Sequence, residues 1–263
     1  MTADVGDEIR VERDGSGVVV ITLNRPERFN ALPRTHWKPL KAVFDDVAAS
    51  MTDRAVVVTG AGGNFCSGAD LSARPKDSER LLRRGLQPVL DAALAIRNLP
   101  QPTIAAVSGW AAGAGMNLAL LCDLVIADET AKFSQIFVDR GLTIDFGGTW
   151  LLPHSVGLHR AKEMALFARK MSGEQLREWG VVNRIVPAGQ ALHVARSWAA
   201  DLAARAPHAV QITKEQLNYS LAQSFEESLM RESMAQDFVV RLDDTKEAMS
   251  AFLEKRTPEF RGR

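Results

Sequence analysis

Short runs of β-branched and aliphatic residues recur along the first two thirds of the chain. Val18–Leu23, Ala55–Thr59 and Thr103–Val107 are the clearest, and each is followed within three residues by a proline or a glycine. Apolar runs closed in this way are typical of buried strands. Further strands are predicted at Leu124–Ala127, Lys132–Ser134 and Val181–Val186.

Between the strands, apolar residues recur at helical spacing. Thr35–Ala49 carries Trp37, Leu40, Phe44 and Val47 on one face, which predicts an amphipathic helix. Strands that alternate with helices indicate βαβ units, in which neighbouring strands are parallel. Further helices are predicted at Leu86–Leu99, Met116–Cys122, Leu158–Phe167 and Ser172–Trp179, the last with Ser172 as its N-cap.

The remainder of the chain shows only helical periodicity. It runs from Ala191 to Ala204 and again from Pro207 to Glu254, with no strands to pair with. We therefore divide the chain into a mixed α/β region, residues 1–200, and a helical region, residues 201–263. An apolar stripe in the helical region must cover either the body of the same chain or a neighbouring subunit. The stripe consists of Phe225, Leu229, Met234, Phe238 and Leu242.

Three stretches lack a regular pattern. Ser72–Arg84 is polar and charged, which predicts a loop. Ser108–Gly115 is rich in small residues, which predicts a turn. Val138–Gly148 is irregular.

Composition narrows the function classes. The 32 basic and 32 acidic side chains leave no basic excess for a nucleic-acid surface. The apolar stretch Ile104–Leu121 is interrupted by Ser108, three glycines and Asn117, so we interpret it as a buried strand and helix, not a membrane span. Two cysteines are too few for a disulfide framework, and the acidic start Met1–Glu12 does not resemble a secretory signal, so the cytoplasm is the expected compartment.

Two turns rich in small residues suggest chemistry. One is Phe65–Leu71, directly after a predicted strand, and the other is Ser108–Leu118, which leads into a helix. The first N–H groups of a helix are unpaired, and two such groups from separate turns can bind an oxyanion. Tight reversal of the chain explains either turn taken alone. The third glycine of a dinucleotide-binding fingerprint is absent after Gly113 and Gly115.

Taken together, the turns resemble motifs of the crotonase (enoyl-CoA hydratase/isomerase) superfamily. Phe65–Leu71 resembles its F-x-x-G-A-D-L/I turn, and Ile104–Asp123 resembles its I-A-A-V-x-G-x-A-x-G-x-G-x-x-L-A-x-x-C-D segment. Asn24–Leu32 is similar to its N-R-P-x-x-x-N-A-L signature. Gly147–Thr149, Gly180–Val186 and Ala251–Arg256 follow in the family's order.

This resemblance implies an α/β fold, a spiral of ββα units followed by a C-terminal helical trimerisation region. It implies a homotrimer or a dimer of trimers. It also implies an acyl-CoA thioester substrate whose carbonyl oxygen lies between the amides of Ala69 and Ala114, with CoA as part of the substrate and no tightly bound cofactor. The resemblance places two of the CoA contacts, Phe252 and Lys255, near a neighbouring subunit's site. The contacts it implies are Arg28, Ala31, Ala69, Asp70, Leu71, Phe252 and Lys255.

The acid residues indicate which reaction to expect. The two glutamates of the family's hydratases correspond to Asn117 and Phe137, and neither side chain exchanges a proton at neutral pH. The segment Gly141–Pro153 resembles the loop of the ring-epoxide isomerases of phenylacetate degradation, which carries an aspartate at the place of Asp145. We predict double-bond or ring isomerisation through an enolate with Asp145 as the single acid/base. An apolar setting between Ile144 and Phe146 would raise its pKa.

Other interpretations stay open. Asp145 is also a common type of turn or cap residue, and Asp139 is expected to pair with Arg140. We expect Cys66 to be a small core residue and Asp123 to be structural. Hydration by a modified route, or binding of acyl-CoA without catalysis, are the rival functions. No serine pairs with a histidine as in a ClpP-like protease, and no histidine has metal-type spacing. Aromatic residues suggest a bulky pocket or core packing equally well: Trp37, Trp110, Phe137, Phe146 and Trp150.

Overall fold

A six-stranded sheet forms the centre of the computed structural model, which describes residues 6–72 and 85–263. Nearly all of the predicted loop Ser72–Arg84 therefore lies outside the described residues. The strand order is β1-β2-β3-β4-β6-β9, with β1 antiparallel to β2 and every other neighbouring pair parallel. The strands are β1 (Ile9–Arg13), β2 (Val18–Leu23), β3 (Ala55–Gly60), β4 (Thr103–Val107), β6 (Leu124–Asp128) and β9 (Arg184–Val186).

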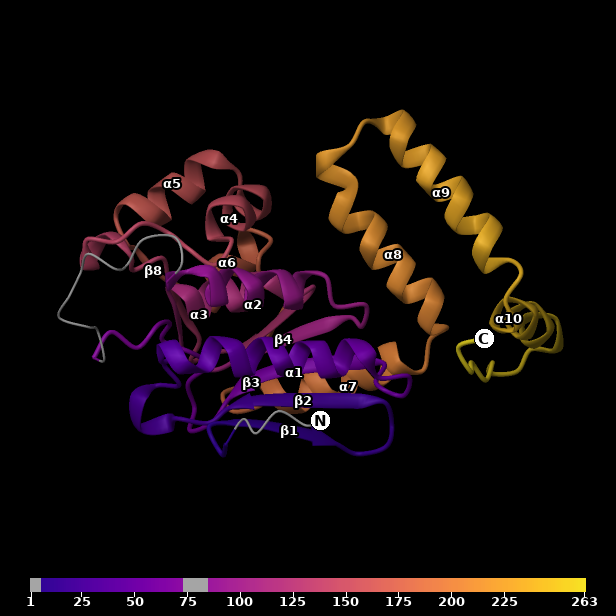
Figure 1. Ribbon diagram of the computed structural model, residues 1–263, viewed down its shortest axis with the longest axis horizontal. Coiled ribbons are helices and arrows are strands. Elements are labelled where there is room, and N and C mark those ends of the chain that lie inside the picture. The colour runs from indigo at the N-terminus through magenta and orange to yellow at the C-terminus, as the bar shows by residue number, and fades with distance from the viewer. Residues whose placement is uncertain (1–5, 73–84) are drawn as a thin grey trace.

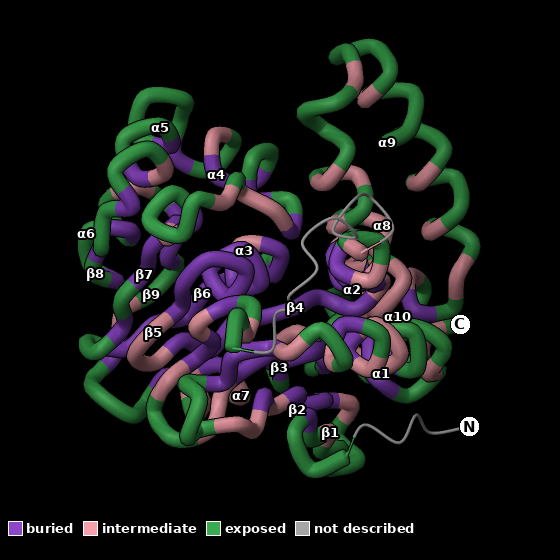
Figure 2. The backbone as a smooth tube through the Cα atoms, turned by 60° about the vertical axis from the view of Figure 1, so that its left-hand side comes forward, coloured by how far each residue is buried: buried purple, intermediate pink, exposed green. Residues whose placement is uncertain are grey.

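The central strands are apolar without interruption because both faces of the sheet are covered. In β2, Val18 and Val20 pack on one face, whereas Val19 and Ile21 pack on the other, and all four are buried. Figure 2 shows the buried strands enclosed by helices. One face carries α1 (Trp37–Ala49), α2 (Gln87–Arg97) and α3 (Ala114–Leu121).

Helix α7 (Ala191–Ala203) covers the opposite face. Its buried residues are Ala191, Ala195, Ala199 and Ala203, spaced four apart and therefore on one side of the helix. Their small side chains let the helix lie close to Val18, Val20, Ala55 and Val57. The predicted boundary between the α/β region and the helical region, after residue 200, falls inside α7, which packs on the sheet through Ala203. The division into two regions stays a prediction.

A second, three-stranded sheet continues the spiral. It consists of β5 (Trp110–Ala112), β7 (Lys132–Ser134) and β8 (Lys170–Ser172), with β5 parallel to β7 and β7 antiparallel to β8. Helices α4 (Gly148–Val156), α5 (Leu158–Leu166) and α6 (Gly173–Glu178) lie on this side of the molecule (Figure 1).

Helices α8 (Pro207–Tyr219), α9 (Phe225–Val239) and α10 (Asp243–Glu254) form the C-terminal region. α8 and α9 run antiparallel and project from the body of the molecule (Figure 1), and neither contains a buried residue. Met230, Met234 and Phe238 recur every fourth residue and are 64%, 67% and 50% exposed. The described part of the chain therefore leaves these three side chains of α9 at least half exposed.

The sequence-based element predictions are confirmed at six strand positions, although the last strand begins only at Arg184. Ser172 caps α6 as predicted, in a capping box with Gln175. Three short strands, β1, β5 and β8, were not predicted, nor was α4. The predicted turn Ser108–Gly115 is wrong over residues 110–112, which pair with β7, and α3 begins two residues early, at Ala114.

The helical character predicted for Pro207–Glu254 is confirmed, although Gln223 and Leu242 adopt extended conformations that divide this segment into the helices α8, α9 and α10. Among the described residues, no helix combines the length and apolar character needed to cross a membrane.

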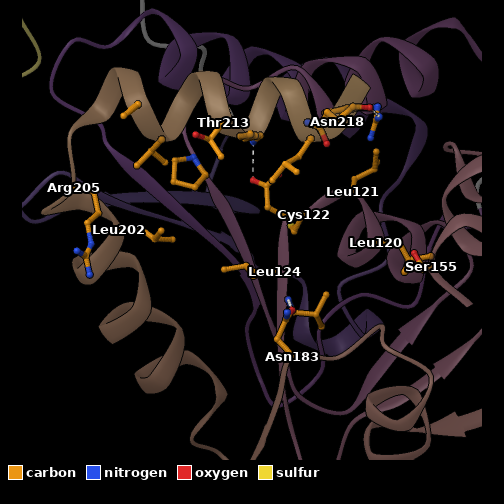
Figure 3. Close-up of a pocket in the computed structure, with 18 of the residues that line it drawn as sticks. Leu120, Leu121, Cys122, Leu124, Ser155, Asn183, Leu202, Arg205, Thr213 and Asn218 are labelled. Carbon is orange, nitrogen blue, oxygen red and sulfur yellow. Dashed lines mark hydrogen bonds and ion pairs between the residues drawn. The ribbon is translucent and has the colours of Figure 1, made fainter. Parts of the chain in front are cut away.

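A groove of about 860 Å³ separates α8 from the sheet (Figure 3). Thr213 and Asn218 of α8 face Cys122 at the end of α3 and Leu124 of β6 across it. Asp123 also lines this groove. Its carboxylate accepts hydrogen bonds from the Thr103 amide and hydroxyl and forms an ion pair with Lys214 at 2.8 Å. The expectation that Asp123 is structural is confirmed, since these contacts attach α8 to the core.

Candidate active site

The two small-residue turns lie side by side. The amide of Cys66 donates to the Trp110 carbonyl, and the Ala112 amide donates to the Cys66 carbonyl, both at 2.9 Å. On the other side of the same segment, Leu32 donates its amide to the Gly68 carbonyl at 2.8 Å. The segment Phe65–Leu71 is thereby held between β5 and the turn that contains Leu32.

Glycine makes this close approach possible. A Cβ atom at Gly68, whose φ is +99°, would lie 2.7 Å from the Ala112 carbonyl oxygen and 3.3 Å from the Ala114 nitrogen. A Cβ atom at Gly115 would lie 2.0 Å from the Cys66 carbonyl oxygen. Both distances to oxygen are shorter than van der Waals contact permits, so the turns meet only because these positions lack side chains.

Two main-chain amides are left unpaired where the turns meet. Within residues 6–72 and 85–263, neither the Ala69 nor the Ala114 nitrogen donates a hydrogen bond. Ala114 is the first residue of α3, where the helix dipole favours negative charge. Both residues line one cavity of about 530 Å³. The arrangement can stabilise negative charge on an oxygen bound between them.

Six residues predicted to bind or act on substrate line this cavity along with Ala114. They come from three separate segments of the chain. They are Arg28, Ala31, Ala69, Asp70, Leu71 and Asp145. Cationic side chains of Arg28, Arg140 and Lys170 also line it, and such groups suit the phosphates of a CoA moiety.

Asp145 lies in the loop before α4, where Phe146 and Gly147 adopt positive φ angles of 51° and 82°. Phe146 is buried against Trp37, with ring centroids 5.1 Å apart, and this packing holds the loop onto α1. The Oδ1 atom of Asp145 is buried and has no hydrogen-bond partner among the described residues. Burial raises the pKa of this carboxyl to about 6.

The other carboxylate near the turns is already engaged. Asp70 accepts hydrogen bonds from the amide and hydroxyl of Ser72, and it pairs with Arg25 at 3.1 Å. The Ser72 bonds hold the pKa of Asp70 below its usual range. Asp70 therefore supports its turn, whereas Asp145 carries a carboxyl suited to proton transfer near neutral pH.

The positions of the two hydratase glutamates hold no acid. Phe137 lines the cavity with its ring, and Asn117 is fully buried. The Asn117 side-chain amide donates to the Asp145 main-chain carbonyl at 2.8 Å and accepts from Gln135 at 2.7 Å. Sequence reasoning missed Gln135, which no local motif marks.

Several expectations about single residues can be compared with the structure. Cys66 is buried and burial raises the pKa of its thiol to about 12, as expected of a core residue. The expected ion pair between Asp139 and Arg140 is wrong, since the described part of the chain contains none between them. Of the aromatic residues, Trp110 lines the cavity, whereas Trp150 stacks on His154 outside it.

Phe252 and Lys255 do not line the cavity of their own chain. Phe252 is 80% exposed on α10, and Lys255 ends that helix with a positive φ of 55°. The segment after α10 contacts Arg54, just before β3, through the Phe260 carbonyl. The contact of Phe252 and Lys255 with CoA at a neighbouring subunit's site stays a prediction.

Comparison with known proteins identifies the family. A model of the enoyl-CoA hydratase/isomerase family matches residues 13–263. The chain is 41% identical to "Probable enoyl-CoA hydratase" of Rhodobacter capsulatus over 250 residues, covering 94% of this chain and 95% of the relative. It is 37% identical over 254 residues to 1,2-epoxyphenylacetyl-CoA isomerase of Escherichia coli K12, covering 94% and 96%.

A solved structure agrees with this result. The crystal structure of enoyl-CoA hydratase from Bacillus anthracis superimposes with a TM-score of 0.94 at 32% identity, covering 98% of this chain and 100% of that one. The chain belongs to the enoyl-CoA hydratase/isomerase family and has the crotonase fold. It is an enzyme of that family, whose related members carry the names of both hydratases and isomerases.

Proposed function

We propose that this enzyme isomerises an acyl-CoA thioester, by a double-bond shift or a ring rearrangement, with Asp145 as the single acid/base. The observation that carries the proposal is Asp145, which lines the same cavity as Ala69 and Ala114 and whose buried Oδ1 has no hydrogen-bond partner among the described residues. Its pKa near 6 leaves the carboxyl mostly ionised at neutral pH and still able to return a proton.

For a 3-enoyl thioester, the steps balance without a co-reactant. The Asp145 carboxylate removes a proton from C2, and the electron pair of that C–H bond moves into the thioester, forming an enolate. The Ala69 and Ala114 amides bind the enolate oxygen. The protonated Asp145 then returns the proton to C4, which gives the 2-enoyl isomer. Each oxyanion donor typically contributes about 10²–10³ in rate, and the proton shuttle about 10²–10⁴.

Hydration by two carboxylates does not suit this site. Asn117 and Phe137 occupy the places of the acids in the family's hydratases, and Asn117 is committed to hydrogen bonds with Gln135 and Asp145. The competing reaction is hydration by a modified route, in which Asp145 positions and activates water. It must be tested because relatives of this chain are named as hydratases.

The test uses trans-3-hexenoyl-CoA and phenylacetyl-CoA, whose α-protons are acidified by the neighbouring alkene or ring. We expect isomerisation of the first and deuterium uptake from ²H₂O at the α-carbon of the second. Asp145→Asn should lower both rates at least about 10²-fold. Asp139→Asn, a carboxylate outside the cavity lining, serves as the matched control.

The other outcomes separate the rival functions. Unchanged turnover in Asp145→Asn would remove this residue from the mechanism. Incorporation of ¹⁸O from labelled water into the product would indicate hydration. Binding of acyl-CoA without deuterium uptake by the unmodified protein would indicate a protein that does not catalyse proton transfer.

The proposal extends to the assembly and to the compartment. The exposed apolar residues of α9 support a homotrimer or a dimer of trimers, in which α10 of one subunit would bring Phe252 and Lys255 to the CoA of another. The absence of a metal or a tightly bound cofactor, and a cytoplasmic location, stay predictions from the sequence.

A further inference from the structure

A chain of buried amides leads from β7 to the Asp145 loop. Gln135, which directly follows β7, donates its side-chain N–H to Oδ1 of Asn117 at 2.7 Å. Because that oxygen is engaged, the nitrogen of the same amide faces the loop and donates to the Asp145 main-chain carbonyl at 2.8 Å. Both side chains are 0% exposed, and neither lines the cavity.

The loop is shaped to receive this amide. A Cβ atom at Gly148 would lie 2.4 Å from the Asn117 nitrogen and 2.5 Å from its oxygen, so only glycine lets the amide pass. The Gly148 amide donates to the same Asp145 carbonyl at 3.0 Å. Two donors therefore hold one carbonyl, and the residue that carries it is the candidate acid/base.

We infer that Asn117, oriented by Gln135, is the positioning residue for the Asp145 carboxyl, an inference that rests on the proposed function. No side chain or amide of the described residues holds Oδ1 of the Asp145 carboxyl, so the position of that carboxyl depends on its backbone. Asn117 fixes that backbone without touching substrate. The position that holds a catalytic acid in the two-carboxylate arrangement serves here as the support of a different acid.

The chemistry of the amide explains why an acid could not take this place. An ionised carboxylate at position 117 has no proton to donate, and its oxygen would face the Asp145 carbonyl oxygen in a dry environment. The Asp145 loop in this conformation and an ionised carboxylate at position 117 therefore exclude each other, and only a protonated acid could donate to the Asp145 carbonyl.

The test uses Asn117→Asp, which keeps the shape of the side chain and, when ionised, has no proton to donate. We expect kcat for trans-3-hexenoyl-CoA to fall by about 10², as for a catalytic group misplaced by about 1 Å, while KM stays within about twofold. Asn183→Asp is the matched control, since Asn183 is exposed outside this cavity and its side-chain oxygen can still accept from the Val125 amide.

A double variant separates a positioning role from a general loss of structure. In the Asp145→Asn background, adding Asn117→Asp should lower kcat no further, because both substitutions remove the same function. Wild-type kcat in Asn117→Asp, or losses that multiply in the double variant, would overturn the inference. Wild-type kcat in Asp145→Asn would instead overturn the proposed function itself.

Gln135→Met provides a second, independent route if Asn117→Asp does not fold. It removes the donor to Asn117, which leaves Oδ1 of Asn117 unpaired, but it also removes the buried Gln135 Oε1, which has no partner among the described residues. We expect kcat to fall about tenfold with unchanged KM, as for supporting hydrogen bonds behind a site. Unchanged kcat in this folded variant would contradict the role of Gln135 and Asn117.

Discussion

The backbone of Gly68 lies so close to Ala114 that a methyl group on Gly68 would stand 3.3 Å from the Ala114 nitrogen. The same methyl group would stand 2.7 Å from the Ala112 carbonyl oxygen. Two segments more than forty residues apart in the chain thus contribute Ala69 and Ala114 to the lining of one cavity. Their separation is set by a residue that has no side chain.

Gly68→Ala should therefore impair both activity and stability. The added methyl group would push the two turns apart, and an alanine at a φ of +99° is strained. We expect kcat/KM to fall by about 10²–10³, the typical effect of losing one oxyanion donor, and the free energy of unfolding to fall by more than about 1 kcal/mol. Gly63→Ala is the control, since Gly63 also has a positive φ but a Cβ atom there would have no atom of the described residues within 4 Å. Equal losses of activity in the two variants would show that backbone strain, not turn separation, matters.

The rate should depend on pH through Asp145. The base form is the ionised carboxylate, and burial raises its pKa to about 6. We expect kcat to rise tenfold per pH unit below about pH 6 and to level off above it. A pH profile of the isomerisation rate measures this, and the residual activity of Asp145→Asn should lack the step. A wild-type profile that is flat from pH 5 to 8 would contradict the assignment.

The raised pKa of Asp145 should also make this residue destabilising at neutral pH. A carboxyl whose pKa is raised on folding binds its proton more tightly in the folded state, so stability is lost as the pH rises from about 4 to about 6. We expect Asp145→Asn to raise the free energy of unfolding by about 1–3 kcal/mol at pH 7.5, with a smaller gain at pH 4. Urea unfolding at the two pH values measures the difference. A variant less stable than the wild type at pH 7.5 would show that the ionised carboxyl has a partner.

The ion pair between Lys214 and Asp123 should anchor α8 to the core. Its side chains are 10% and 23% exposed, and Asp123 also holds Thr103 at the start of β4. Lys214→Met should lower the free energy of unfolding by about 1–3 kcal/mol, because it leaves a mostly buried carboxylate without its cation. The matched control is Lys41→Met on the more exposed pair with Asp45, for which we expect a change within about 0.5 kcal/mol. If Lys214→Met lowers the free energy of unfolding no more than Lys41→Met, the ion pair under α8 adds no more stability than an exposed pair.

The apolar residues of α9 should mediate assembly. Met230→Lys together with Met234→Lys places two charges on one exposed face of the helix, and we expect sedimentation equilibrium to show dissociation of the oligomer. Met51→Lys, at an apolar residue that is 89% exposed outside the helical region, should leave the mass unchanged. An unmodified protein that sediments as a monomer would refute the proposed trimer.

Local sequence by itself determined the buried strands, the amphipathic helix α1 and the cap at Ser172, because each depends on side chains close together in the chain. The motifs Phe65–Leu71 and Ile104–Asp123 also identified the family and predicted that their two turns serve one site. Strands β1, β5 and β8 escaped prediction because they are short or carry charged residues, and pairing with a neighbour stabilises them.

Only the tertiary structure decided what Asn117 and Asp145 do. The absence of the hydratase glutamates was visible in the sequence, but the hydrogen bonds from Gln135 to Asn117 and from Asn117 to the Asp145 carbonyl join residues 18 and 28 positions apart. Likewise, the apolar neighbours Ile144 and Phe146 predicted only that the pKa of Asp145 is raised, whereas its value of about 6 follows from the burial that contacts in the folded chain produce. Such contacts depend on how the chain folds back on itself, and no local pattern of residues encodes them.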